Sequence, residues 1–225
     1  MSVNNSIMSY QNIPWRKDNK AKVVSEAEML VRNHVTADSN EYLKITQGRE
    51  EQWCADTVNY VYQMALGFNP FGIKNNGEYL YPNVSGLKNW ALFHGRYHES
   101  KYQNETAPHF DTFQTGDIII FKAPYTVKTS DGKMVTRHAS HTGIIKEVKG
   151  GKVITIEGNA NIRKKDKNGE YLLVHNDKDG QNGNQAIGDF QEVNHDDGVI
   201  ERVYSLQDLA DYGYSGYVDM QGLTF

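Results

Sequence analysis

The sequence predicts an α+β fold, in which helices from the first half of the chain pack on an antiparallel sheet of about five or six strands from the second half. Before residue 96, apolar residues recur at three-to-four spacing in three segments, which is typical of amphipathic helices. After residue 115, short apolar runs are bounded by turn residues, which is typical of strands. The 225 residues can bury a core as one domain, so we expect residues 1–225 to form a single unit.

Three helices are predicted. The first spans residues 18–35 within an N-terminal helical extension, residues 1–40. The second spans residues 51–66 and ends at Gly67, so it places Cys54 in its first turn. The third is short, with Ser85 as its cap and its end near Gly95.

The predicted strands follow the helices. They span residues 118–121, 141–148, 153–157, 199–204 and 214–220, with a turn of helix at 207–212. Gly150 and Gly151 join the second and third strands as a hairpin. Residues 122–137 are expected to form a long loop beside His141 that borders a cleft. Residues 160–198 are expected to form a loop-rich insertion, with residues 171–174 as a short strand inside it.

Charge and composition exclude several classes of protein. The 24 basic and 28 acidic residues are interspersed and give a net charge of -4, which argues against nucleic acid as a partner. No apolar segment is long enough to span a membrane, and the N-terminus lacks the basic start and apolar run of a signal peptide. A single cysteine excludes an intramolecular disulfide and leaves the thiol of Cys54 available for chemistry.

Four residues form a candidate site for nucleophilic attack on an amide. A thiol attacks as the thiolate, which a helix N-terminus and a nearby imidazole both favour, so Cys54 is the candidate nucleophile and His141 the candidate base. Glu157 and Asn159 share a strand face if the extended conformation continues, and either can orient the imidazole. The backbone N–H of Cys54 is the candidate oxyanion donor.

Each of these residues also has an ordinary structural interpretation. Cys54 can be an inert residue on an apolar helical stripe, and His138 competes for the role of base, although His141 has the advantage of opening a predicted strand. Glu157 and Asn159 can simply end a hairpin, because Gly-Asn is common in turns.

The combined motifs are more specific than any one of them. The motifs that carry the resemblance are Trp53-Cys54-Ala55 before a helix, Gly116-Asp117 before an apolar strand, His141-Thr142-Gly143 and Glu157-Gly158-Asn159. Over residues 51–160 the chain resembles the CHAP family of cysteine, histidine-dependent amidohydrolases and peptidases, a branch of the NlpC/P60-like, papain-related fold. Residues 199–220 are similar to the last strands of that family. The resemblance implies that Cys54 is the nucleophile, His141 the base, Glu157 the residue that orients it and Asn159 an assisting residue.

The resemblance does not extend to a metal site. Some phage members of the family bind calcium through an acidic stretch before the cysteine, but residues 43–49 lack it and only Asp56 is a plausible remnant. Residues 177–180 supply oxygen ligands without EF-hand spacing. A metal bound by Cys54, His141 and Glu157 is a weak alternative, because no paired Cys or His spacing supports it. We therefore expect no cofactor.

The resemblance implies a peptidoglycan hydrolase, either an N-acetylmuramoyl-L-alanine amidase or an endopeptidase. We expect it to be made in the cytoplasm and to act in the periplasm or on the cell wall after export by another route. One setting is an antibacterial effector toxin with an immunity protein as its partner, and another is a single-domain phage lysin. A cysteine protease or deamidase that acts on a protein remains an alternative, as does a binding module with an inactive site.

Overall fold

The computed structural model describes residues 17–49, 52–72, 83–100, 112–128, 133–161 and 197–221. The helices in these segments are α1 (Lys17–Arg32), α2 (Asn40–Thr46), α3 (Cys54–Leu66), α4 (Val84–Phe93) and α5 (Leu206–Asp211). The strands are β1 (Tyr97–Glu99), β2 (Ile118–Lys128), β3 (Met134–Lys149), β4 (Lys152–Asn161), β5 (Asp197–Tyr204) and β6 (Tyr214–Val218).

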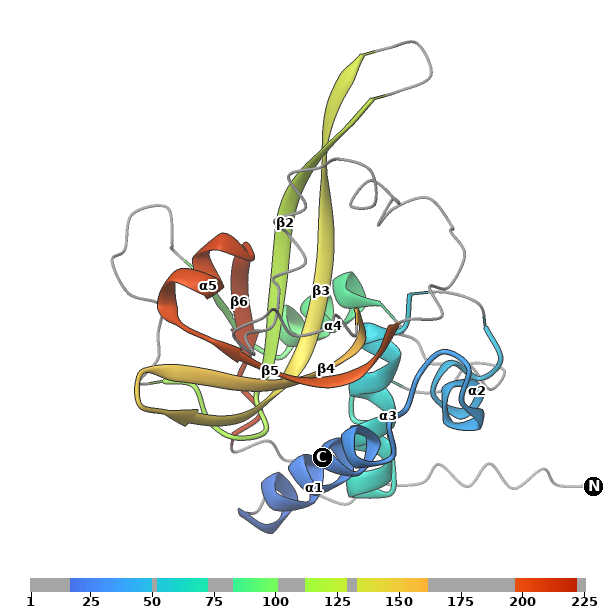
Figure 1. The fold of residues 1–225 in the computed structure, drawn as a ribbon. Helices are drawn as coiled ribbons and strands as arrows, with labels where there is room; N and C mark the ends of the chain where they lie inside the picture. Colours follow the sequence, from blue (N-terminus) through green and yellow to red (C-terminus); the bar gives the residue numbers. More distant parts are fainter. Residues whose placement is uncertain are drawn as a thin grey trace, which may run out of the picture.

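The six described strands form one sheet in the order β1-β6-β2-β3-β4-β5, and every neighbouring pair is antiparallel (Figure 1). Helices α1, α3 and α4 pack on this sheet, α3 contacts both β3 and β4, and α2 packs against α3. The prediction of an α+β fold with N-terminal helices on an antiparallel sheet of five or six strands is confirmed.

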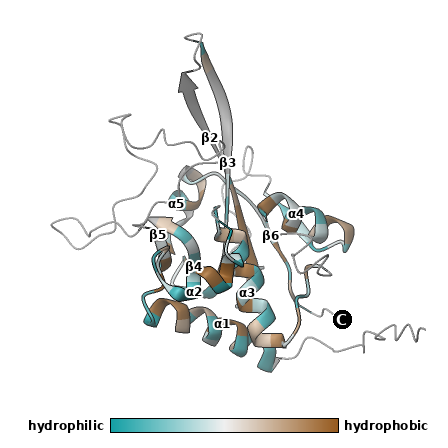
Figure 2. Ribbon diagram, turned by 90° about the vertical axis from the view of Figure 1, so that its right-hand side faces the viewer, coloured by the Kyte–Doolittle hydropathy of each residue, from teal (hydrophilic) through white to brown (hydrophobic). Residues whose placement is uncertain are grey.

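The sheet is buried on both faces, which explains the nearly continuous apolar run at the start of β2. Ile118 and Ile120 belong to a core cluster with α1, α3 and α4. Ile119 and Phe121 belong to a second cluster with Leu209 of α5. Because successive side chains of a strand point to opposite faces, a strand between two cores must be apolar at every position. The hydrophobic parts of α3 and β3 lie together in the middle of the molecule (Figure 2).

Helix α1 contributes directly to the main core. Val23, Ala27 and Leu30, at three-to-four spacing, are buried in the same cluster as α3. On the outer surface, Lys146 of β3 lies 2.8 Å from Glu28 of α1 and 2.6 Å from Glu201 of β5. The N-terminal helix is therefore packed against the sheet that carries the candidate site. Within the part of the chain that the structure describes, no helix combines the length and apolar character that a membrane crossing requires.

The prediction of a loop at residues 122–137 is wrong for residues 122–128 and 134–137, which belong to strands. Strands β2 and β3 remain paired from Lys122 opposite Ser140 to Lys128 opposite Met134, and this hairpin projects beyond the sheet (Figure 1). Its residues lack a long apolar run, because an arm outside the sheet needs backbone pairing but little core. His141 consequently lies inside β3 and does not open a strand.

Other differences concern short elements. Helix α4 begins at Val84, and its cap is Asn83, whose side chain accepts from the Gly86 N–H at 2.7 Å, so the assignment of Ser85 as cap is wrong. Helix α2, capped by Ser39, and strand β1 were not predicted, because each is too short to show a clear period. The predicted strand at residues 171–174 lies outside the described residues.

Asp117 joins the turn before β2 to the chain after β6. Its carboxylate is fully buried and accepts from the backbone N–H of Gln114 at 2.8 Å, the N–H of Met220 at 3.1 Å and Nε2 of Gln221 at 2.8 Å. Asp117 therefore has a structural role. It satisfies one donor in its own turn and two donors about a hundred residues later in the chain.

We expect Asp117→Ala to lower the free energy of unfolding by about 2–4 kcal/mol, because it leaves buried donors without an acceptor. Urea denaturation at pH 7 measures this change. Asp117→Asn keeps one acceptor oxygen and should lose less. Equal stability of wild type and Asp117→Ala would contradict the assignment.

Candidate active site

Cys54 is the first residue of α3, and the residue is 4% exposed. The N-cap residue, Trp53, makes no side-chain hydrogen bond to the first turn of the helix. The first N–H groups of a helix have no acceptor within it, and they carry partial positive charge. The sulfur of Cys54 therefore lies at a position that favours negative charge.

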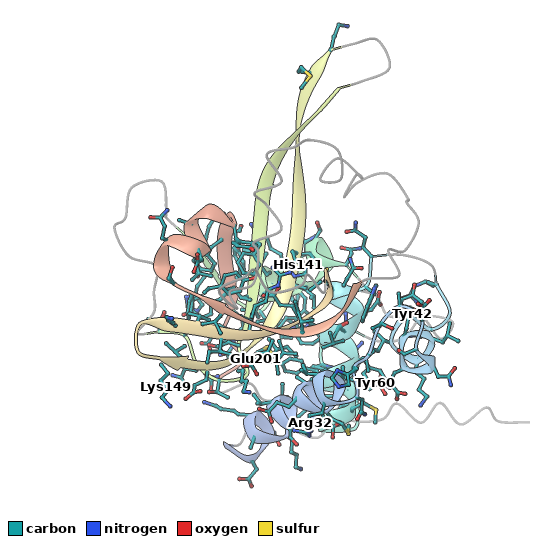
Figure 3. All side chains as sticks on the ribbon, viewed as in Figure 1. Arg32, Tyr42, Tyr60, His141, Lys149 and Glu201 are labelled. Carbon is teal, nitrogen blue, oxygen red and sulfur yellow. The ribbon has the colours of Figure 1, made fainter. Side chains whose placement is uncertain are left out.

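His141 and Glu157 lie on the neighbouring strands β3 and β4. Nε2 of His141 is 2.9 Å from Oε2 of Glu157, whose side chain is fully buried, whereas that of His141 is 29% exposed. Figure 3 shows His141 at β3, near the middle of the molecule. The exposed part of the imidazole gives solvent access to the site beside the buried sulfur.

The ionisation of the pair fixes the orientation of the imidazole. Burial raises the pKa of Glu157, but the hydrogen bond and charge of His141, with smaller contributions from Arg202 and Thr155, outweigh burial and lower it from 4.5 to about 2. An ionised carboxylate only accepts hydrogen bonds, so the proton of the shared bond must be on Nε2 of His141. The other ring nitrogen, Nδ1, is then left for the thiol.

The imidazole interacts with both residues. Burial lowers the pKa of His141, but hydrogen bonding to Cys54 and to Glu157, with the charges of both, raises it from 6.5 to about 10. An imidazolium next to a thiol stabilises the thiolate form, which is the nucleophile. The structure thus brings together three of the four predicted site residues, in the order Cys54, His141, Glu157.

The buried carboxylate has further partners that the sequence analysis missed. Oε1 of Glu157 accepts from Thr155 Oγ1 at 2.6 Å and from the hydroxyl of Tyr204 at 2.8 Å. Nε of Arg202 lies 3.5 Å from Oε2. Thr155 could have been found, because it shares a predicted strand face with Glu157. Nothing in the sequence pattern singles out Tyr204 and Arg202, which lie on β5.

Two glycines allow the three elements to approach one another. A Cβ at Gly143 would lie 2.5 Å from Cγ of Glu157, and a Cβ at Gly158 would lie 1.9 Å from Oγ1 of Thr57 on α3. Real Cβ atoms do not come this close to other atoms, so both positions require glycine. The glycines of the His141-Thr142-Gly143 and Glu157-Gly158-Asn159 motifs thus permit the contacts on which the site depends.

The sequence profile of the CHAP domain matches residues 46–159, which is half of the chain and includes Cys54, His141 and Glu157. The chain belongs to the CHAP domain family. The family is one of peptidoglycan-related amidases and peptidases, so the protein falls among the hydrolases. No curated protein and no solved structure matches the chain.

Asn159 does not follow the expected alternation in this CHAP domain. Its φ is +54°, and the pairing register between β4 and β5 shifts between Glu157 and Ala160. The regular alternation that was expected to place Asn159 on the face of Glu157 is therefore interrupted after Glu157, although β4 continues to Asn161. Among the described side chains, Asn159 makes no hydrogen bond to Cys54, His141 or Glu157, and its assisting role stays a prediction.

His138 lies three residues before His141 on β3, opposite Pro124 in the projecting hairpin. Its side chain lies outside what the structure describes. His141, in contrast, contacts Glu157 directly, so the geometry favours His141 as the base.

Asp56, the expected remnant of a calcium site, is paired within the chain. Its buried Oδ1 lies 2.6 Å from Nη2 of Arg49, so a guanidinium already compensates its charge. In the described segments, no three His, Cys, Asp or Glu side chains form a cluster suited to a metal ion. Residues 177–180 lie outside the described residues.

The His141–Glu157 pair makes stability depend on pH in two directions. The lowered pKa of Glu157 contributes stability that is present above pH 4.5 and is lost as the pH falls towards 2. The raised pKa of His141 contributes stability that is present below pH 6.5 and is lost as the pH rises towards 10.

We therefore expect the difference in the free energy of unfolding between wild type and Glu157→Gln to be largest between pH 4.5 and 6.5. Urea denaturation at a series of pH values measures it. Glu201→Gln, which removes a carboxylate that is 38% exposed, is the control. A difference that does not change with pH would contradict the proposed charge states.

Proposed function

We propose that this CHAP domain cleaves an amide bond of bacterial peptidoglycan, with Cys54 as nucleophile, His141 as base and acid, and Glu157 as the residue that orients His141. The observation that carries the proposal is that one imidazole interacts with both the thiol at a helix N-terminus and a buried carboxylate. This set of groups suits acyl transfer, because it supplies an activated sulfur and a proton carrier at one place.

In the proposed first step, the thiolate of Cys54 attacks the carbonyl carbon of the amide. The carbonyl oxygen becomes negatively charged, and the first-turn N–H groups of α3 are suited to bind it. The imidazolium of His141 gives its Nδ1 proton to the leaving nitrogen as the C–N bond breaks. An amine departs, and the acyl group remains on sulfur as a thioester.

In the second step, neutral His141 takes a proton from water through Nδ1, and the resulting hydroxide attacks the thioester carbon. The C–S bond breaks, a carboxylic acid leaves, and the thiolate and imidazolium are restored. Glu157 remains ionised throughout and keeps the Nε2 proton of His141 in place.

Two bonds in peptidoglycan fit this chemistry. An N-acetylmuramoyl-L-alanine amidase cuts between glycan and peptide, and an endopeptidase cuts within the peptides. Both reactions need the same groups, because specificity arises from the surroundings of the site. Mass spectrometry of muropeptides released from purified sacculi distinguishes them: free lactyl carboxylates on the glycan identify an amidase, and shortened stem or cross-bridge peptides identify an endopeptidase.

We expect Cys54→Ala to reduce fragment release from purified sacculi by about a thousandfold or more, because it removes the nucleophile. His141→Ala should have a comparable effect. The controls are the circular dichroism spectrum and melting temperature of each variant, which exclude misfolding. Equal release by wild type and Cys54→Ala would eliminate the proposal, and wild-type activity on a folded protein with none on sacculi would favour the protease or deamidase alternative.

The biological setting is a separate proposal. An enzyme that cuts peptidoglycan damages a bacterium only from the wall side of its membrane, so we propose that the protein acts in the periplasm or on the wall. We propose further that it is an antibacterial effector toxin delivered by secretion, and that the producing cell is protected by an immunity protein. A phage lysin of the same chemistry is the alternative setting.

Expression in a susceptible host tests the place of action. We expect wild type with an added export signal to lyse the host from the periplasm, and Cys54→Ala with the same signal to be harmless, because lysis requires the nucleophile. The cytoplasmic form without an added signal should also be harmless. Growth unaffected by periplasmic wild type would count against the effector proposal, as would toxicity confined to the cytoplasm.

A further inference from the structure

Both oxygens of the Glu157 carboxylate are occupied, and by different groups. Oε2 accepts from Nε2 of His141 at 2.9 Å, while Oε1 accepts from Thr155 at 2.6 Å and from Tyr204 at 2.8 Å. Rotation of the carboxylate about its last bond would break all three hydrogen bonds. The two hydroxyl donors therefore fix the direction in which Oε2 faces the imidazole.

A second residue of β5 supplies positive charge. Nε of Arg202 is 3.5 Å from Oε2 of Glu157, and the Arg202 side chain is only 15% exposed. The far end of its guanidinium is held by Tyr212, because Nη1 is 3.3 Å from the tyrosine hydroxyl and the cation lies 5.9 Å from the ring centre. Arg202 is thus a fixed cation behind a buried carboxylate.

Arg202 and Tyr204 lie outside the segment that matches the CHAP profile. That segment ends at residue 159, whereas β5 is Asp197–Tyr204. Strand β5 pairs with the edge of β4 that lies opposite β3. The matching segment contains Cys54, His141 and Glu157 but not the Tyr204 donor and the Arg202 cation that hold Glu157.

We propose that Tyr204 and Arg202 are positioning residues for the reaction, and that the functional site of this protein extends through β5. Tyr204 fixes the rotation of the Glu157 carboxylate, and Arg202 keeps it ionised. A carboxylate that turned away or took up a proton would no longer accept the Nε2 proton of His141, and Nδ1 would lose its fixed direction towards Cys54. This inference rests on the proposed roles of Cys54 and His141 but not on the identity of the substrate.

Iodoacetamide alkylation of Cys54 measures the thiol–imidazole pair without any substrate. We expect Tyr204→Phe to lower the alkylation rate at pH 6 by about fivefold to tenfold, since one donor to the carboxylate is lost. Tyr214→Phe is the matched control, because this buried hydroxyl is in the same aromatic cluster and has no hydrogen-bond partner among the described residues. It should react as wild type does. Equal rates for Tyr204→Phe and wild type would overturn the role of Tyr204.

A double-mutant cycle with Glu157→Gln tests whether Tyr204 acts through the carboxylate. In the Glu157→Gln background, we expect Tyr204→Phe to cause little further loss of alkylation rate, because the group that it positions is absent. The same fold loss in both backgrounds would show a merely structural role and overturn the proposal. If Glu157→Gln already reacts no faster than the unfolded protein, the cycle has no range left. The pH dependence of alkylation in the Arg202 variants then decides whether the proposal stands.

The role of Arg202 is tested by the pH dependence of alkylation. Removal of its charge in Arg202→Met should make Glu157 easier to protonate, so the loss of alkylation on the acid side should move up by about one pH unit. Arg202→Lys keeps the charge and should restore most of the wild-type profile. Two results would overturn the proposal. One is a lower alkylation rate in Arg202→Met at every pH with no shift along the pH axis, and the other is a shift that Arg202→Lys does not reverse.

The same variants are then assayed on purified sacculi. Parallel losses in alkylation and in fragment release support both the positioning role and the proposed function. Alkylation that responds as expected in a protein that leaves sacculi intact supports the positioning role and eliminates peptidoglycan as substrate. Sacculus digestion by wild type with unchanged alkylation in all variants supports the proposed function and eliminates the positioning role.

Discussion

The hydrogen bond between His141 and Glu157 is the contact on which the proposed chemistry of this protein depends. It joins a partly exposed imidazole to a fully buried carboxylate at 2.9 Å. A buried carboxylate is costly unless it is paired, and here the pairing also determines which ring nitrogen carries a proton. If this bond were absent, the helix N-terminus would still favour negative charge on Cys54, but no fixed group would take up and return the proton.

The fold provides this contact by bringing backbones unusually close. Glycine at position 143 leaves room for the side chain of Glu157, and glycine at position 158 lets β4 approach Thr57, one turn after Cys54 on α3. The apolar pattern of β2 places cores on both faces of the sheet, so the strands around the site are held from both sides. The candidate site residues thus lie on a helix and two strands, as a preorganised site requires.

The sequence was sufficient to predict those parts of the structure that show a regular spacing of apolar residues or a recognisable motif. Helices α1 and α3, the starts of β2 and β4 and the order of the strands along the chain follow from apolar spacing, and Cys54, His141 and Glu157 follow from motifs. The projecting hairpin was missed because its backbone pairing needs no apolar pattern. Tyr204 and Arg202 were missed because their partner, Glu157, lies more than forty positions earlier, and only the pairing of β4 with β5 brings them together.

The charges of the site explain why a cation behind Glu157 is useful throughout the proposed reaction. In the proposed mechanism, the groups before attack alternate in sign: Arg202 is a cation, Glu157 an anion, His141 a cation and the Cys54 thiolate an anion. When the thioester forms, the negative charge on sulfur disappears, and His141 loses its positive charge to the leaving amine in the same half-reaction. Glu157 would then be a buried anion beside a neutral imidazole. Arg202 stays charged, so the carboxylate keeps a cationic partner both before attack and in the thioester. This partner stabilises the ionised carboxylate, and the proton therefore stays on Nε2 of His141.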